Sequence, residues 1–346
     1  MKKSISFFLA IAMLLSIVPQ IAMATENNLC TDYSNVTLGE IQDIFHDYLE
    51  NEGMQFSLGS DAYYSYIVDQ LLNRTDTSLM EHENYDLIHS YMVEYKLAYE
   101  DYLLCMDSLE DECCDSDVLT VISNTSLCVK YQDDAGKVTF SISEEFLNQT
   151  IGEIACSNQA NILVAENAVM SSTPYTYSGS DAATYAKLYA NNYNTEYPSY
   201  SADCTNYVSQ CVYAGGIAMD GSNSAAGTYE STDDWYCVYI NSVLWIKRYA
   251  VTTSWVRVSD FSTFMGTIAG KSTHETIDSL YSACEIGDVV QLADKITGSA
   301  YHSIIISEKD STSAYYCGHS NDRNNVDIEG ALDESSDNFI LFEFTR

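Results

Sequence analysis

The spacing of hydrophobic and polar residues along this chain changes between a helical and a strand-like period. Four segments place apolar side chains three and four residues apart, which predicts amphipathic helices: residues 38–50, 61–73, 83–106 and 151–169. Between the last two, three short runs with alternating apolar residues predict strands: Val118–Ile122, Ser126–Tyr131 and Val138–Ser143. The first half of the chain is therefore predicted to contain helices and a small antiparallel sheet.

A second pattern follows the polar stretch 171–179, which we interpret as a linker between domains. A helix from Ser180 or Asp181 to about Asn192 is expected next, and then a short helix that starts at Cys204. Residues 217–262 are predicted to be rich in loops. Strand signals end the chain: residues 287–292, 302–307, 314–317 and 338–345. This order predicts an α+β domain at 180–346, preceded by an α+β domain of unknown role at 25–170.

The first residues have the features of a secretory signal peptide. Lys2 and Lys3 precede an apolar run at residues 5–18, and Ala22-Met23-Ala24 has the small residues of a cleavage site. We expect cleavage after Ala24, which removes residues 1–24 and yields a secreted protein, extracellular or associated with the cell wall. No later segment approaches the roughly 20 apolar residues that a membrane span needs.

The charge of the chain narrows the classes of partner. The 15 Lys and Arg residues stand against 50 Asp and Glu, for a formal net charge of −35. Residues 25–165 carry 27 acidic and 4 basic residues, and residues 166–346 carry 23 and 9. Because phosphate binding needs clustered Lys and Arg, this balance argues against nucleic acid as a partner and disfavours anionic membrane surfaces.

The 11 cysteines are expected to form disulfides in an oxidising compartment. Because their number is odd, at least one thiol has no partner within the chain. The sequence contains no pair of C-x-x-C motifs, no H-E-x-x-H motif, no twelve-residue calcium loop and no phosphate-binding glycine pattern. We therefore expect neither a metal ion nor a cofactor, and the sequence predicts no particular oligomeric state.

The stretch D-C-T-N-Y-V-S-Q-C-V-Y-A-G-G at residues 203–216 is the best candidate for chemistry. Its apolar positions recur with a helical period, Ser201 or Asp203 can cap the helix, and two glycines can end it. Cys204 would then lie in the first turn, where free backbone N–H groups and the helix dipole favour the nucleophilic thiolate. Asp203 can cap the helix or bind a substrate amine, and its charge would raise the pKa of the thiol.

A nucleophilic thiol needs an imidazole that shares its proton and a third group that orients the imidazole. His302 opens the apolar run H-S-I-I-I-S. If the next apolar run forms a hairpin with it, His319 and Asn321 return beside His302, and either could orient its ring. Asp322 is a third candidate, and Asp322 and Asp203 are also candidates for contacts to substrate or oxyanion. The backbone N–H of Cys204 and a neighbouring donor would hold the oxyanion.

These residues resemble the putative amidase domain family of secreted Firmicutes proteins. That family shows a D-C-T-N-F-V-S-Q-like core, a downstream W-x-x-V, a G-D-V-x-x-L strand, an H-S strand start and a final H-x-N-D. The same motifs occur here in the same order: Asp203–Gln210, Trp255–Val258, Gly287–Leu292, His302-Ser303 and His319–Asp322. The resemblance covers about residues 180–325. The family is similar to the NlpC-like and CHAP groups of papain-like amidases, which often cleave peptidoglycan amide bonds.

The resemblance implies a papain-like catalytic domain with Cys204 as nucleophile, His302 as base, and His319 or Asn321 as the orienting partner. Our leading hypothesis is a secreted cysteine amidase or peptidase that hydrolyses amide bonds in peptidoglycan peptide stems through an acyl-enzyme. Two alternatives are kept. The protein could be a cysteine protease or transpeptidase acting on peptides or proteins, or a non-catalytic acidic binding module that retains the fold.

Overall fold

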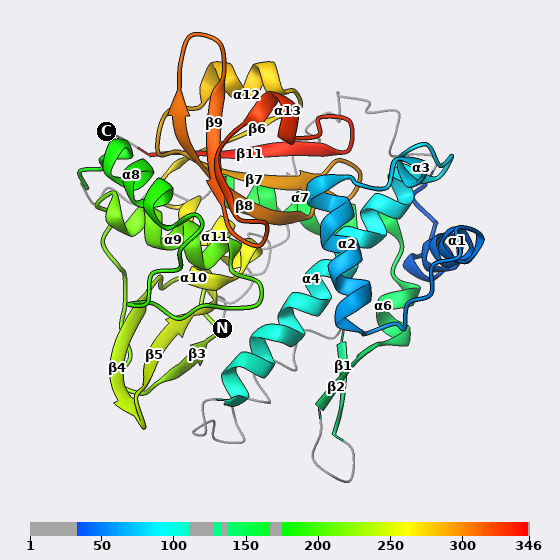
Figure 1. Ribbon diagram of the computed structural model, residues 1–346, viewed down its shortest axis with the longest axis horizontal. Helices are drawn as coiled ribbons and strands as arrows, with labels where there is room; N and C mark the ends of the chain where they lie inside the picture. The colour runs from blue at the N-terminus through cyan, green and yellow to red at the C-terminus, as the bar shows by residue number, and fades with distance from the viewer. Residues whose placement is uncertain (1–32, 111–127, 133–137, 167–174, 345–346) are drawn as a thin grey trace, which may run out of the picture.

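The computed structural model describes residues 33–110, 128–132, 138–166 and 175–344 of the 346-residue chain. Its N-terminal part has helices arranged around the long helix α4, together with a two-stranded antiparallel ribbon (Figure 1). The elements of this part are α1 (Leu38–Asn51), α2 (Asp61–Asn73), α3 (Thr77–Met80), α4 (Tyr85–Glu110), β1 (Cys128–Gln132), β2 (Val138–Ile142), α6 (Glu144–Asn148) and α7 (Ile151–Glu166).

The C-terminal part is built on a six-stranded antiparallel sheet with strand order β10-β9-β8-β7-β11-β6. A second sheet has three strands in the order β3-β5-β4. The elements of this part are α8 (Gly179–Tyr189), α9 (Cys204–Ala214), β3 (Gly227–Tyr229), β4 (Cys237–Val243), β5 (Ile246–Thr252), α10 (Thr253–Val256), α11 (Val258–Met265), β6 (Gly270–His274), α12 (Ile277–Ala283), β7 (Val289–Asp294), β8 (Ala300–Lys309), β9 (Ala314–Gly318), β10 (Arg323–Asp327), α13 (Ile328–Ala331) and β11 (Asp337–Glu343).

The six-stranded sheet has a hydrophobic cluster on each face, as the alternation along β8 illustrates. Ile304 and Ile306 belong to a cluster with apolar side chains of α1, α2 and α4, whereas Ile305 belongs to one with side chains of α8, α9 and α11. The N-terminal helices therefore complete the core on one face, while the helix that begins at Cys204 covers the other. The first of these clusters extends over both halves of the chain.

Polar side chains also join α4 to the β7–β8 hairpin. The Asp294 carboxylate lies 2.9 Å from His89 Nδ1 and accepts a hydrogen bond of 2.9 Å from Ser90 Oγ. Further along α4, the buried Lys96 ammonium donates to the Tyr301 carbonyl at 2.6 Å. Because buried charged groups are costly without partners, these contacts favour one orientation of α4 on the sheet.

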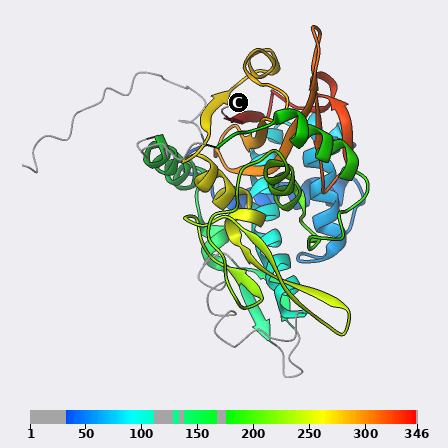
Figure 2. The same cartoon turned by 90° about the vertical axis from the view of Figure 1, so that its left-hand side faces the viewer.

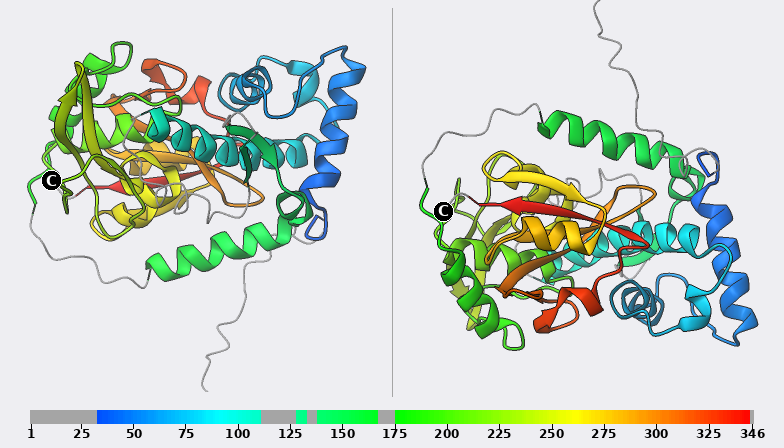
Figure 3. Two further views of the ribbon diagram at one scale, coloured as in Figure 1. Left: turned by 90° about the horizontal axis from the view of Figure 1, so that it is seen from below. Right: turned by 90° about the horizontal axis from the view of Figure 1, so that it is seen from above.

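The last helix of the N-terminal part, α7, lies along the outside of the molecule (Figure 3). Its Asn158 side chain donates to the Thr297 carbonyl at 2.9 Å and to Ser299 Oγ at 2.8 Å. Both acceptors lie in the β7–β8 turn. The N-terminal part is thus attached to this hairpin twice, through α4 and through α7.

Most elements lie where the hydrophobic pattern predicts them, and the predicted mixture of helices and antiparallel strands is confirmed. The four predicted N-terminal helices correspond to α1, α2, α4 and α7, and the predicted hairpin corresponds to the antiparallel pair β8–β9. The expected strand at 118–122 and the signal peptide at 1–24 lie outside the described residues. Among helices in the described ranges, none is long and apolar enough to cross a membrane.

Two predictions about elements were wrong. The helix after the linker begins at Gly179, and its N-cap is Ser178, whose hydroxyl accepts a hydrogen bond from the Asp181 backbone N–H. Residues 217–262 are not mainly loop, because they form the three-stranded sheet and two short helices. The sequence pattern did not predict these strands because β4 buries only its first residue and because the turn after it has no Gly, Asn, Asp or Pro.

Candidate active site

Cys204 is the first residue of α9, as its sequence pattern predicts. The predicted apolar face is buried, and so are the polar residues of the first two turns, because α9 contacts α8, α10 and β8. Gly216 follows the helix with φ of +109°, a backbone conformation that favours glycine. The amphipathic pattern predicted the helix, but only the packing shows that residues 204–212 are buried on every face while Tyr213 is 42% exposed.

The Cys204 thiol is enclosed as well, since the residue is 2% exposed. Burial is the largest influence on the thiol and raises its pKa above the usual value. The Lys96 ammonium lowers this pKa, the Glu100 carboxylate raises it, and the Ser303 backbone N–H and the Thr205 hydroxyl, which lies 3.7 Å from Sγ, lower it. The expectation of a thiolate is therefore wrong for this conformation, because desolvation of the charged form outweighs the favourable dipoles.

His302 is the third residue of β8 rather than its first, and it is 4% exposed. Burial, together with the positive charges of Lys96 and Arg323, lowers the pKa of its ring to about 3. The imidazole is therefore neutral near pH 7, and its Nδ1 has no hydrogen-bond partner within the described residues. The next residue, Ser303, is hydrogen bonded to the Thr205 hydroxyl at 3.1 Å, and its backbone N–H lowers the pKa of the Cys204 thiol. The strand segment that carries His302 is thus adjacent to the thiol.

His319 lies just after β9, but its two ring nitrogens point to other partners than His302. Nδ1 is 2.6 Å from Asp203 Oδ2, and Nε2 is 2.9 Å from the Tyr189 carbonyl. Both partners are acceptors, so a ring nitrogen that carries a proton can donate to the partner it faces. The ring also lies between the aromatic rings of Tyr193 and Tyr207, at centroid distances of 4.2 and 3.9 Å. In this arrangement His319 connects the end of β9 to α8 and α9.

Asp203 occupies the N-cap position of α9 without forming a side-chain capping bond to the helix backbone. Its Oδ1 accepts hydrogen bonds from the Tyr200 backbone N–H at 2.9 Å and from Asn206 Nδ2 at 2.8 Å, while Oδ2 pairs with His319. The carboxylate is 1% exposed. Its contacts stabilise the loop that leads into Cys204, and they leave it turned away from solvent.

Asn321 and Asp322 lie beyond the end of β9 and have other neighbours. The side-chain amides of Asn321 and Asn73 are hydrogen bonded, with 2.6 Å between their closest atoms. Asp322 is exposed and has a positive φ of 39°. Within the described residues, neither forms a hydrogen bond with His302. The structure therefore brings the His302 segment to Cys204, whereas the predicted orienting groups bond elsewhere.

A narrow pocket of about 110 Å³ opens at Cys204. One wall belongs to α4, and the other belongs to the segment that joins α10 and α11, with residues Leu97, Glu100, Asp101 and Leu104 facing Val256, Arg257, Val258 and Ser259. A space of this size can hold several water molecules. The N-terminal part of the chain therefore forms part of the site, which the sequence did not predict.

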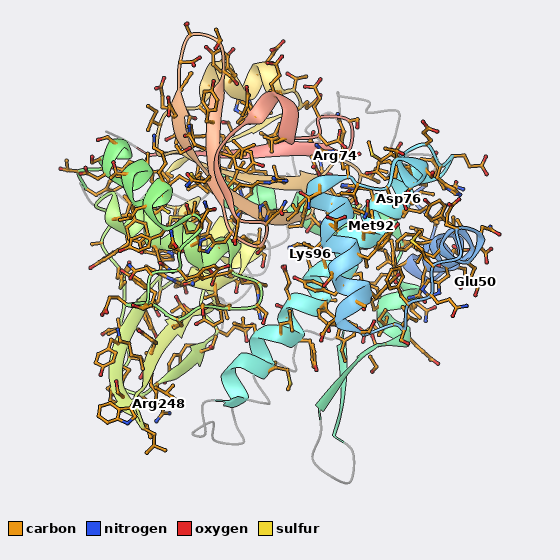
Figure 4. All side chains as sticks on the ribbon, viewed as in Figure 1. Glu50, Arg74, Asp76, Met92, Lys96 and Arg248 are labelled. Carbon is orange, nitrogen blue, oxygen red and sulfur yellow. The ribbon has the colours of Figure 1, made fainter. Side chains whose placement is uncertain are left out.

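The charged groups beside this pocket form one pair within α4 and one pair between α4 and the α10–α11 segment. Lys96, on α4, is labelled in Figure 4. The Lys96 ammonium is fully buried, 2.7 Å from Glu100 Oε1, and the same oxygen accepts a hydrogen bond of 2.9 Å from Tyr64. On the other wall, Arg257 Nε lies 2.8 Å from Asp101 Oδ1. The sequence held a weak signal for both cations, because basic residues are rare in this chain and Arg257 lies inside the W-x-x-V motif.

The cysteines differ from the expected disulfide pattern. Seven cysteines of the described ranges are free thiols: Cys105, Cys156, Cys204, Cys211, Cys237, Cys284 and Cys317. All but Cys156 are buried. The part of the chain that the structure describes contains no cluster of three or more metal-ligating side chains. A free thiol alone therefore does not distinguish Cys204, and its position at the start of α9 beside β8 does.

Comparison with known proteins supports an amidase-like segment in the second half. Residues 176–342 match the family model described as "Putative amidase domain". A stretch of 62 residues, 18% of this chain, is 36% identical to a Bacillus subtilis (strain 168) protein described as "Uncharacterized protein YhbB", and it covers about a fifth (20%) of that protein. No solved structure matches the chain. Neither description names the NlpC-like or CHAP groups.

Proposed function

We propose that this protein is a cysteine amidase in which Cys204 attacks an amide carbonyl and His302 accepts the thiol proton. The observation that supports this most is the contact between the start of α9 and β8. There the Thr205 hydroxyl lies 3.7 Å from the Cys204 sulfur and 3.1 Å from the Ser303 hydroxyl, and the neutral ring of His302 belongs to the residue before Ser303. Both residues lie inside the segment that matches the amidase family model.

The resting protonation states of the two groups are those from which general-base catalysis starts, and not those of a preformed ion pair. Burial raises the pKa of the Cys204 thiol and lowers that of His302, so the resting pair is a thiol and a neutral imidazole. The proton would pass from Sγ to the ring as the carbon–sulfur bond forms. The same proton would then go to the leaving amine, and water would hydrolyse the thioester and restore the thiol.

Two groups beside the sulfur would stabilise the tetrahedral intermediate. The backbone N–H of Cys204 is at the start of α9, where helix N–H groups have no intrahelical acceptor. The Ser303 backbone N–H faces the same sulfur and is a second donor near the reacting carbon. The third catalytic partner stays open, with His319 and Asn321 as the sequence candidates and with an unbonded His302 Nδ1 to receive it.

We propose peptide stems of peptidoglycan as the substrate, outside the cell. The signal-peptide features support secretion, and the family resemblance supports the wall substrate. The strongly negative chain would attract cationic amine groups of a peptide and would repel anionic polymers. A cysteine protease or transpeptidase that acts on other peptides would use the same residues.

The test compares two buried thiols of the same helix. We expect Cys204→Ala to lower hydrolysis of purified peptidoglycan by roughly 10³-fold or more, while Cys211→Ala stays within a few-fold of the native protein. Mass spectrometry of the products identifies the bond that is cut. Unchanged activity in Cys204→Ala would exclude this nucleophile, and cleavage of a peptide library without cleavage of the wall would favour the protease alternative.

A further inference from the structure

The β4–β5 hairpin presents an apolar tip that neither the core nor the proposed chemistry uses. Val243, Leu244, Trp245 and Ile246 are 47%, 84%, 98% and 63% exposed. The hairpin projects away from the six-stranded sheet in two perpendicular views (Figures 1 and 2). Scattered exposed apolar residues are ordinary, but four consecutive large ones at a projecting tip mark a binding surface.

The backbone conformation of the tip does not favour the apolar residues found in its turn. Val243 pairs with Ile246, so Leu244 and Trp245 form a two-residue turn, with φ of +48° and +74°. Both φ values are positive, as in the type I′ turn, which strongly favours Asn-Gly. Large side chains in this conformation are strained, and such strain is typically retained at functional sites.

The charge around the tip is opposite to that of the rest of the chain. Residues 235–259 contain no Asp or Glu, although the whole chain has a net charge of −35. Lys247 and Arg248 follow the tip directly. Lys247 lies 2.8 Å from Glu196, whereas Arg248, labelled in Figure 4, forms no ion pair within the described residues. A free cation therefore lies just behind the apolar residues.

The shape of the tip indicates what kind of partner it fits. Val243 and Ile246 are paired directly across the hairpin, so their side chains share one face, and Leu244 and Trp245 form the turn beyond them. The two turn residues are the most exposed, at 84% and 98%. A partner that takes up the projecting end of the hairpin would bury both of them. Arg248 follows Trp245 by three residues, which is about 10 Å along a strand at about 3.3 Å per residue. A medium that surrounds the apolar end of the hairpin and carries anionic groups at that depth would bury Trp245 and bind Arg248 at the same time.

We propose that the β4–β5 tip inserts into the interfacial region of a lipid bilayer. Leu244 and Trp245 enter the boundary between headgroups and acyl chains, and Arg248 binds a lipid phosphate. The acidic body of the protein is repelled by anionic lipid, so apolar burial drives the binding. The natural target is therefore a surface of zwitterionic phospholipid.

The test uses the full chain and phosphatidylcholine vesicles. We expect co-sedimentation with the vesicles that persists in high salt, and a blue shift of tryptophan emission. Trp235 and Trp255 are fully buried in the protein, so this shift reports on Trp245. The double substitution Leu244→Asn/Trp245→Gly should lower the partition coefficient by about tenfold or more, because it removes two apolar side chains.

The same double variant keeps the result free of folding artefacts. It introduces the preferred type I′ residues, so we expect its melting temperature to rise rather than fall. Trp245→Phe is the matched control and should retain vesicle binding within a few-fold. Cys204→Ala should bind vesicles as the native chain does, so failure of the proposed chemistry and failure of this proposal are separable.

Three results would overturn the proposal. The native chain could fail to bind phosphatidylcholine vesicles, or the Leu244→Asn/Trp245→Gly variant could bind them equally well. Sedimentation without lipid could also show a dimer that this variant cannot form, which would make the tip an interface between two copies.

Discussion

Two histidines near the β8–β9 hairpin have contrasting surroundings, although both are buried. His319 has an acceptor at each ring nitrogen and an aromatic ring on each side. His302 has no partner at Nδ1 within the described residues, and burial beside two cations keeps its ring neutral. The sequence offered both as members of one catalytic group. Their contacts suggest different roles, one in holding the α9 start and the other in proton transfer.

The contrast shows that histidines predicted to form one catalytic group can have different roles, one in proton transfer and one in stabilising the site. A ring with all its hydrogen bonds made is poorly suited to exchange protons during a reaction, whereas a neutral ring with a free nitrogen is ready to do so. The Asp203–His319 pair stabilises the residue before the thiol, and the His302 segment contacts the thiol itself. The following predictions test this division, from the largest expected effect to the smallest.

The largest difference should appear in turnover. We expect His302→Gln to reduce amide hydrolysis by about 10³-fold, because Gln cannot accept the Cys204 proton. His319→Gln retains a hydrogen-bonding side chain and should cost less than about tenfold if the ring is structural. Steady-state kinetics of both folded variants on one substrate measure the difference. Equal losses would show that both rings take part in the chemistry.

The free energy of unfolding should fall more when His319 is replaced than when His302 is replaced, which is the reverse of the order expected for turnover. His319→Ala leaves the Asp203 carboxylate buried without its partner, and we expect a loss of about 3 kcal/mol in the free energy of unfolding. His302→Ala should cost less, since its Nδ1 has no bond to lose. Denaturant unfolding measures both. Adding Asp203→Asn to His319→Ala should recover part of the loss, and an additive double variant would contradict the pairing.

The pH dependence of stability should separate the two rings further. The folded pKa of His302 is about 3 and the unfolded value is about 6.5, so the unfolded state binds more protons between these values. The group thus destabilises the fold as the pH falls below 6.5, by about 2 kcal/mol at pH 5. His302→Gln should remove this part of the slope, while His319→Gln keeps it. Unfolding curves at both pH values provide the measurement.

The smallest effect is expected on the pKa of the Cys204 thiol, from the Lys96 charge that α4 contributes. The Lys96 charge lowers the pKa of both the Cys204 thiol and the His302 ring. The double substitution Lys96→Met/Glu100→Gln removes the buried pair together. Because Lys96 lowers the pKa of the Cys204 thiol more than Glu100 raises it, alkylation of Cys204 by iodoacetamide should then require a slightly higher pH. Peptide mass analysis distinguishes Cys204 from the other thiols. Lys187→Met, at an exposed pair, is the control, and identical pH profiles in all three proteins would show that the Lys96–Glu100 pair has no net influence on the thiol.

Local patterns were sufficient for most of the elements near the site. The helical period around Tyr207, Val208 and Cys211 predicted α9 and its first residue, because burial of one face follows from that spacing. The runs at 302–307 and 314–317 predicted the β8–β9 pair. The β4–β5 hairpin was missed, since its turn has two large apolar residues where turn chemistry favours Asn and Gly.

The amino-acid order by itself therefore determined which segments form helices and strands, where the thiol lies in its helix, and the acidic character of the chain. The tertiary structure alone decided the environment of each side chain. It buried Cys204 and His302, brought Glu100 of α4 to the pocket at Cys204, and directed His319 to Asp203. The physical reason is range: backbone periodicity acts between near neighbours in sequence, whereas the burial of Cys204 and the Asp203–His319 pair depend on residues more than a hundred positions apart.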